Sequence, residues 1–200
     1  INIDGIERPT TNSEGRPIYP TEEGIRNFWK WFGGSKVVDG QGRPLVVYHG
    51  TNKNFDTFDQ SKLNTGSGSY SGKGFYFTPS IAEAGGWAEI QGDQPNVMPV
   101  YLRIVNPHSF VLRNYNWQAE DDFSIRLQDK GYDGIIAKVQ DIDTETNEIS
   151  DEFIKEIVAF NPNQIKSAIG NTGAFSDDPN ILKQGGETPP AGQLPPGKTP

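Results

Sequence analysis

The chain has 200 residues, a formal net charge of −8 and a hydrophobic content of 34%, as expected for one domain with a modest core. Because it contains no cysteine, disulfides, thiolate metal sites and cysteine nucleophiles are excluded. The acidic balance disfavours nonspecific binding to nucleic acid, and no apolar run approaches the roughly 18 residues that cross a bilayer.

The first predicted helix begins after Thr21. Residues 1–20 contain three prolines and little periodicity, which indicates a loosely attached lead-in. Thr21 offers an N-cap hydroxyl, and Glu22 and Glu23 stand in the first turn, where the helix dipole favours carboxylates. The helix should run to about Phe32 and end at the glycine pair that follows. Its aromatic residues share one face and are expected to pack in the core: Phe28, Trp29, Trp31 and Phe32.

Short strands joined by turns are expected after this helix, which favours a β or α+β class. Residues 36–50 indicate a strand, a turn and a second strand, and the Gly- and Ser-rich residues 59–72 indicate a mobile loop. A second helix is expected to begin at Pro79–Ser80. The Pro- and Gly-rich residues 176–200 predict a tail or linker. Further strands are expected within three later segments: 96–112, 131–139 and 152–160.

The chain has two histidines, His49 and His108, so a metal site with three histidine ligands is impossible and no metal is predicted. His108 follows a proline turn and is expected on an exposed loop. His49 ends an apolar strand and precedes Gly50 and Thr51, where backbone groups can meet a ligand. Taken alone, this pattern fits a hydrogen-bonded strand-end histidine equally well.

Three segments occur in a fixed order within residues 45–168: YHGT at 48–51, GKGFYFTP at 72–79 and KEIVAFNPNQIKSA at 155–168. This ordered set resembles the ADP-ribosyltransferases of the His-Tyr-Glu group, which includes diphtheria-toxin-like and poly(ADP-ribose) polymerase-like catalytic domains. The blocks WFGGSKVVDGQGRPLVVYHGT and IKSAIGNTGAF are still more similar to the bacterial and phage branch found as modules of polyvalent proteins.

The resemblance implies an α+β fold over residues 21–175, with a split β-sheet core of two packed, mostly antiparallel sheets and flanking helices. It also implies NAD as the ADP-ribose donor, release of nicotinamide and a macromolecular acceptor, with protein expected. Chain elongation to poly(ADP-ribose) would need a second ADP-ribose site, which the sequence does not identify. We therefore expect mono-ADP-ribosylation.

The resemblance also assigns NAD-binding roles to the strand that ends in YHGT. His49 matches the histidine that hydrogen-bonds the adenosine ribose, and it counts among the catalytic residues of the group. Gly50 matches the glycine whose backbone meets the nicotinamide amide, with Thr51 beside it.

Tyr76 matches the aromatic residue that packs against the nicotinamide ring, and Gly74 is expected to let the backbone approach the dinucleotide. Trp87 stands eleven residues later, at the position of the second aromatic wall. The serine that often contacts the amide is Ala84 here, and Ser80 could replace it. Because side chains alternate along a strand, the phenylalanines that flank Tyr76 are expected in the core.

Glu156 is the candidate catalytic carboxylate, because it interrupts an otherwise apolar strand at the position of the family glutamate. That glutamate binds the nicotinamide-ribose hydroxyl and stabilises the cationic sugar. An exposed acidic strand residue is the alternative reading. Its neighbours Glu152 and Lys155 are expected on the surface. Ile154 stands where the arginine-modifying class has Glu or Gln, so arginine-specific transfer is not favoured.

The acceptor is the least determined partner. The acidic loop at 141–151 could attract a basic target or could simply be a solvated hairpin. The loop at 59–71 is expected to cover the NAD groove and to move on binding. An NAD glycohydrolase and a silent NAD- or partner-binding module remain alternatives, and a nucleic-acid acceptor is disfavoured by charge. We expect a soluble, cytoplasmic monomer, delivered into a target cell if it is an effector or toxin, without signal peptide or transmembrane segment.

Overall fold

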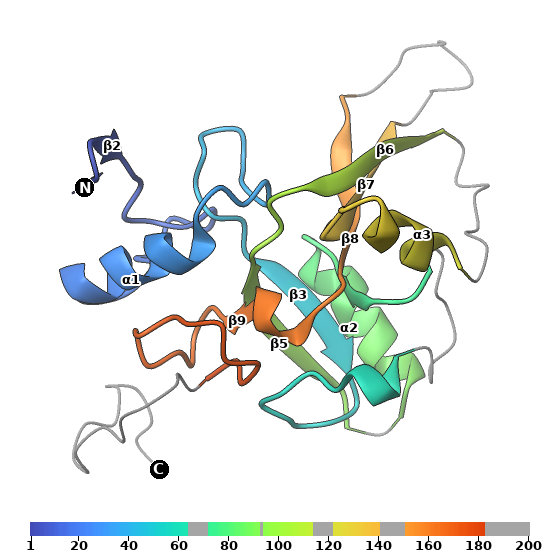
Figure 1. Ribbon diagram of the computed structural model, residues 1–200. Helices are drawn as coiled ribbons and strands as arrows, with labels where there is room; N and C mark the ends of the chain where they lie inside the picture. Colours follow the sequence, from blue (N-terminus) through green and yellow to red (C-terminus); the bar gives the residue numbers. More distant parts are fainter. Residues whose placement is uncertain (64–71, 93, 114–121, 141–150, 183–200) are drawn as a thin grey trace.

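The computed structural model describes residues 1–63, 72–92, 94–113, 122–140 and 151–182. Three α-helices lie in these ranges (Figure 1): α1 (Glu22–Phe32), α2 (Ile81–Ile90) and α3 (Phe123–Asp129). The strands are β1 (Asn2–Ile3), β2 (Ile6–Glu7), β3 (Val47–Thr51), β4 (Phe75–Phe77), β5 (Asn96–Leu102), β6 (Pro107–Arg113), β7 (Gly134–Gln140), β8 (Phe153–Ala159) and β9 (Ile165–Ser167). Two 3₁₀ turns complete the list: η1 (Gln60–Lys62) and η2 (Pro162–Gln164).

Two larger sheets form the body of the molecule. One has the order β3-β5-β9 and is antiparallel throughout, and the other has the order β4-β8-β7-β6, in which β6 and β7 run parallel. An isolated bridge between Tyr48 and Thr78 brings β3 beside the end of β4. The predicted α+β fold with a split, mostly antiparallel core is confirmed.

The core between the two sheets follows the period-2 alternation of their strands. Phe75 and Phe77 are buried, whereas Tyr76 between them is half-buried, as the sequence predicted. The two phenylalanines belong to an apolar cluster with Val100 of the three-stranded sheet and Ile157 of the four-stranded sheet. Burial of such side chains contributes about 25 cal/mol per Å² of apolar surface, so this cluster holds β3, β4 and β8 in register.

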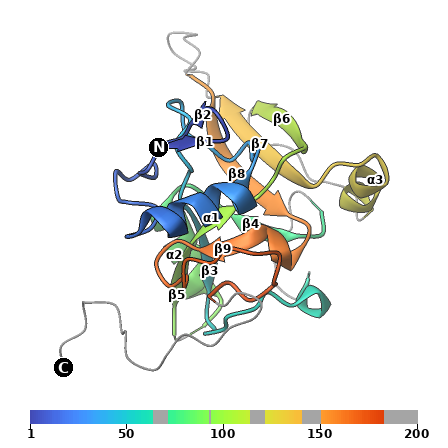
Figure 2. The same cartoon turned by 60° about the vertical axis from the view of Figure 1, so that its left-hand side comes forward.

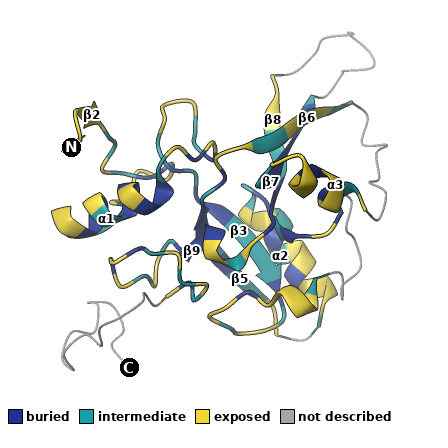
Figure 3. Cartoon of the chain, in the orientation of Figure 1, coloured by how far each residue is buried: buried dark blue, intermediate teal, exposed yellow. Residues whose placement is uncertain are grey.

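Helix α1 packs against the three-stranded sheet. The Thr21 hydroxyl accepts a hydrogen bond from the Gly24 amide at 3.2 Å, and the helix ends at Gly33, whose φ is +55°. One face of α1 is buried and the other exposed (Figure 3). The buried aromatic residues pack with Tyr101 of β5 and with Phe175. Figure 2 shows α1 in front of the sheets, near β9. The helix and its role in the core are as predicted.

Residues 1–20 and 176–182 pack more closely than their composition suggests. In the segment expected as a loose lead-in, Ile18 is buried and the Asn12 amide donates to the Tyr101 hydroxyl at 3.0 Å. Beyond residue 175, Ile181 is 2% exposed and joins the core between the sheets. The buried Lys166 ammonium donates to the carbonyls of Asp178 and Asn180. Ile181 and the backbone that binds Lys166, which lie in the range predicted as a tail from residue 176, are thus packed against the fold.

His108 lies in β6 rather than on an exposed loop, so that prediction is wrong. Its ring is half-buried, with centroids 5.2 Å from Tyr132 and 5.8 Å from Phe123. Burial lowers its pKa, and Lys130 adds to this effect. In the parallel pairing of β6 with β7, Pro107 lies opposite Gly134 and His108 opposite Ile135. Within the described residues, no helix is long and apolar enough to cross a bilayer.

Candidate NAD and catalytic site

The candidate site is built around the bridge that joins the two sheets. The Tyr48 amide donates to the Thr78 carbonyl at 2.8 Å, and the Thr78 amide donates to the Tyr48 carbonyl at 3.0 Å. Backbone groups of alternate residues in a strand point to the same edge. The amide and carbonyl of Gly50 therefore face the edge of β3 that points away from β5. The expected contact of the Gly50 backbone with a ligand stays a prediction.

His49 links this strand to β4. Its Nδ1 lies 2.9 Å from the Tyr76 carbonyl oxygen, and because a carbonyl can only accept, Nδ1 carries the proton. Burial lowers the pKa of His49, so the imidazole is neutral near pH 7. The rings of Phe58 and Phe77 pack around it at 5.0 and 5.6 Å. Nε2 is then left as a hydrogen-bond acceptor for a donor such as a hydroxyl.

Gly50 is required by the helix that covers it. A Cβ at this position would lie 1.9 Å from the Ala84 carbonyl oxygen and 3.1 Å from the Ala88 amide nitrogen. Ala84 and Ala88 are the buried residues of α2, and their small side chains permit this close approach. Gln91, just after the helix, donates to the Gly50 carbonyl at 3.3 Å. The glycine therefore sets the distance between β3 and α2.

Tyr76 occupies the centre of β4. The Tyr76 hydroxyl donates to the Gly72 carbonyl, and the Tyr76 carbonyl oxygen lies 2.9 Å from Nδ1 of His49. In the sheet, Tyr76 pairs with Val158 of β8. The ring packs beside the cluster that contains Val158 and Leu127 of α3. Tyr76 and His49, which the sequence assigned to one site, are thus neighbours in the structure.

Gly74 and Thr51 have local roles in the fold. A Cβ on Gly74 would lie 2.1 Å from Cγ1 of Val158, so this glycine is required for packing against β8. Thr51 is 5% exposed, and its hydroxyl accepts from the Lys53 amide at 3.3 Å. These contacts explain both residues without a ligand. Their expected contact with NAD stays a prediction.

Glu156 lies in β8 close to both motifs. Phe77 pairs with Ile157, and one further step along this register places Thr78 opposite Glu156. Because Thr78 also pairs with Tyr48, β3, the end of β4 and β8 lie side by side at Thr78. Glu156 is half-buried and two residues from Val158, the partner of Tyr76. Two residues in a strand span about 6.6 Å, so the three motifs converge at the junction of the sheets.

The sequence suggested that Lys155 is a surface residue, whereas the structure shows that it contacts another element. Its ammonium forms an ion pair with Oε1 of Glu83 on α2, with 31% of the Lys155 side chain and 36% of the Glu83 side chain exposed. Oε2 of Glu83 accepts from the Thr78 hydroxyl at 2.9 Å. Glu152, also expected on the surface, is 41% exposed and pairs with Lys138. Sequence reasoning missed the pair of Lys155 and Glu83, because the two residues are 72 positions apart.

Helix α2 carries the second predicted aromatic wall. Trp87 is 42% exposed and follows Ala84, whose carbonyl lies over Gly50. Ser80, the suggested replacement for the missing serine, is the N-cap of α2: its hydroxyl accepts from the Glu83 amide at 3.2 Å. The hydroxyl is thus already engaged in the helix start that the sequence predicted.

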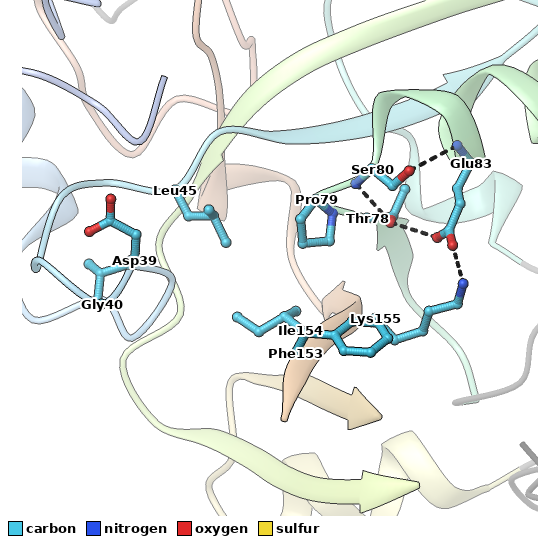
Figure 4. A pocket seen from close by; sticks show the side chains of 11 residues that line it. Asp39, Gly40, Leu45, Thr78, Pro79, Ser80, Glu83, Phe153, Ile154 and Lys155 are labelled. Carbon is cyan, nitrogen blue, oxygen red and sulfur yellow. Dashed lines mark hydrogen bonds and ion pairs between the residues drawn. The ribbon is translucent and has the colours of Figure 1, made fainter. Parts of the chain in front are cut away.

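A cavity of about 430 Å³ lies directly beside this junction (Figure 4). Three segments meet around it: the turn at Asp39 and Gly40, the start of α2 and the start of β8. Its wall is mainly apolar, with Glu83 and Lys155 at one end. The lining residues are Val38, Asp39, Gly40, Leu45, Thr78, Pro79, Ser80, Glu83, Phe153, Ile154 and Lys155. None of the predicted NAD-binding residues lines it, although Ile154 and Lys155 directly precede Glu156.

Each charged side chain that lines the cavity forms an ion pair: Glu83 with Lys155, and Asp39 with Arg43. Asp39 accepts from the amides of Gln41 and Arg43, and the Arg43 guanidinium lies 2.7 Å from its carboxylate. These hydrogen bonds from Arg43 and Gln41 hold the pKa of Asp39 below its usual value despite the opposing effect of burial. Among the residues that the structure describes, no group of three acidic or histidine side chains is arranged to hold a metal ion.

Comparison with known proteins identifies the family. A family model described as "ADP-Ribosyltransferase in polyvalent proteins" matches residues 39–175, which is more than half of the chain. The chain belongs to this ADP-ribosyltransferase family. No curated protein matches it significantly. The matched range of this polyvalent-protein ADP-ribosyltransferase contains His49, Tyr76 and Glu156, so the resemblance that the three motifs indicated is confirmed.

Proposed function

We propose that this ADP-ribosyltransferase cleaves NAD and transfers one ADP-ribose unit to a protein acceptor. The family establishes ADP-ribosyl transfer in general. The observation that carries the finer proposal is the junction of the sheets, where His49 contacts the Tyr76 backbone and Glu156 lies two residues from the partner of Tyr76. These residues come from three separate segments of the sequence.

The residues of the junction suit the parts of NAD. The Nε2 atom of His49 accepts from a hydroxyl of the adenosine ribose, and the Gly50 backbone bonds the nicotinamide amide. Tyr76 and Trp87 supply aromatic faces for the nicotinamide ring. The contact of His49 Nδ1 with the Tyr76 carbonyl, which leaves Nε2 as the acceptor, supports the first assignment.

Glu156 acts on the nicotinamide ribose. When the bond between C1′ and the nicotinamide nitrogen breaks, its electron pair leaves with nicotinamide and positive charge develops on the sugar. A carboxylate held beside the ribose stabilises that charge, which is worth about 3–4 kcal/mol for one well-aimed group. The acceptor then forms a bond to C1′ and loses its proton. If water takes the acceptor position, the same residues produce free ADP-ribose.

The cavity beside Glu156 gives the acceptor a path that is separate from the NAD-binding residues. Its volume of about 430 Å³ lies within the range of small ligand sites. The acidic segment that was also expected to meet the acceptor, residues 141–151, lies outside the described residues except for Asp151. An effector or toxin role and a cytoplasmic location remain parts of the proposal.

Labelled NAD tests the proposal when it is incubated with the domain and a cell lysate. We expect label on protein, with labelling reduced about 100- to 1,000-fold by Glu156→Gln and unchanged by Glu152→Gln, a control four residues away. Free labelled ADP-ribose without labelled protein would indicate a glycohydrolase, and label on nucleic acid would indicate another acceptor. Unchanged NAD would contradict the proposed reaction.

A further inference from the structure

This inference rests on the proposed function and concerns the residues around Glu156. The ladder between β7 and β8 is irregular at this point: Ala137 pairs with Glu156, whereas the next residue, Lys138, pairs with Ile154. Lys155 is therefore an extra residue in β8. A bulge of this kind bends the strand and re-aims the neighbouring side chains. The direction of Glu156 consequently depends on what holds the bulge.

The side chain of Lys155 ties the bulge to helix α2. It reaches across to Glu83 on α2, so the contact joins two elements that are distant in sequence. Figure 4 shows Lys155 extended along the cavity wall toward the carboxylate. An isolated, partly exposed ion pair contributes only about 0–1 kcal/mol. The pair is therefore better understood as a geometric tie than as a source of stability.

Glu83 is in turn held by the junction of the sheets. Helix α2 begins with the sequence Ser80-x-x-Glu83, the pattern of a capping box, in which the glutamate side chain returns to the N-cap amide. Here the Thr78 hydroxyl accepts from the Ser80 amide at 3.2 Å and donates to Glu83. The carboxylate of Glu83 can therefore bind Lys155 as well. Thr78 is itself fixed by its two backbone bonds to Tyr48.

We propose that Glu83 and Lys155 are positioning residues, which aim the Glu156 carboxylate at the nicotinamide ribose. The chain of contacts runs from β3 through Thr78 and Glu83 to Lys155, next to Glu156. Loss of the tie leaves the fold and the NAD-binding strand β3 in place but lets the bulge relax. A displacement of about 1 Å in a catalytic group can reduce the rate by up to about 100-fold.

Three measurements separate positioning from binding and from stability: kcat from steady-state release of nicotinamide, the Kd for NAD and the Tm. We expect Lys155→Met and Glu83→Gln to lower kcat at least about tenfold, with the Kd for NAD and the Tm close to wild type. Lys155→Arg and the charge exchange Lys155→Glu with Glu83→Lys should restore part of kcat. Lys138→Met and Glu89→Gln are controls, since the first breaks the ion pair between Lys138 of β7 and Glu152 and the second alters an exposed glutamate of α2. Neither should change kcat.

Three results would overturn the inference: unchanged kcat in both single variants, a loss of kcat fully explained by a higher Kd or a lower Tm, or no recovery in either restoring variant.

If the wild-type domain releases no nicotinamide, the proposed function fails, and the contact between Lys155 and Glu83 is then tested by NMR. Glu83→Gln should shift the Glu156 amide resonance and Glu89→Gln should not. An unmoved Glu156 resonance would then contradict the inference.

Discussion

The two sheets that meet at Tyr48 and Thr78 contribute different chemistry to the candidate site. The β3 side presents neutral groups on a regular ladder: the imidazole of His49 and the backbone of Gly50. The β8 side presents charged groups at a bulge, Lys155 and Glu156. Regular strands hold hydrogen-bonding groups at constant spacing, whereas a bulge can direct one carboxylate. In the proposed function, β3 accordingly binds the dinucleotide and β8 acts on its reacting bond.

The largest effect on the binding side is expected from Gly50→Ala. The new Cβ would lie 1.9 Å from the Ala84 carbonyl, so α2 must move away from β3. We expect the free energy of unfolding to fall by about 1–3 kcal/mol and the affinity for NAD to fall with it. Thermal unfolding and calorimetric titration measure both. Gly40→Ala is the control, because its Cβ meets no atom within 4 Å. Wild-type values for Gly50→Ala would contradict the account.

Filling the cavity should affect the acceptor and not NAD. Gly40 lines the cavity in an open position, so Gly40→Trp can place an indole there without backbone strain. We expect labelling of protein to fall severalfold, while nicotinamide release in the absence of acceptor stays at the wild-type rate. Scintillation counting of protein and of free nicotinamide gives both values. Equal losses in both would show that the cavity is not specific to the acceptor.

The pH dependence of NAD binding tests the neutral imidazole on the β3 side. Burial places the pKa of His49 below 6.5, so Nε2 remains an acceptor until the pH falls under that value. We expect NAD affinity to be flat above pH 6.5 and to weaken severalfold in more acidic buffer, the loss of one hydrogen bond of about 0.5–1.5 kcal/mol. His49→Gln should abolish the acid limb and His108→Asn should retain it. A decline centred above pH 6.5 would contradict this assignment.

A separate effect concerns the far edge of the three-stranded sheet, which contributes no residue to the candidate site. Burial lowers the pKa of Lys166 from 10.5 to about 8, although Asp178 and Asp177 oppose the change. Between these two values the unfolded chain binds more protons than the folded one, so stability rises with pH. Wild type should therefore gain free energy of unfolding relative to Lys166→Met from about pH 8 to 10.5. A difference that is constant or falls with pH would refute the assignment.

Local signals were sufficient for several elements of the fold. The threonine cap and aromatic face of residues 21–32, the alternation around Tyr76 and the Ser80 helix start each depend on neighbouring residues, and each appears in the structure. The ordered motifs also indicated the family. The bulge at Lys155 and its contact with Glu83 were not predictable, because they arise from pairing between distant segments.

Residues 1–20 and 176–182 show the same limit. Prolines and glycines marked both ends as loosely attached, yet Ile18 and Ile181 are buried by elements far away in the sequence. His108 was placed on a loop because it follows Pro107, whereas that proline begins an edge strand that pairs in parallel with β7. Composition describes a segment by itself, and its burial depends on the partners that the fold provides.

The most direct test of the central claim is a crystal structure of the domain with a non-cleavable NAD analogue. The account predicts one dinucleotide across the junction of the sheets, with Nε2 of His49 and the Glu156 carboxylate each within about 3.2 Å of a ribose hydroxyl. Tyr76 should lie against the nicotinamide ring. An analogue bound in the cavity beside Asp39 and Phe153, or one that contacts His49 without Glu156, would contradict the account.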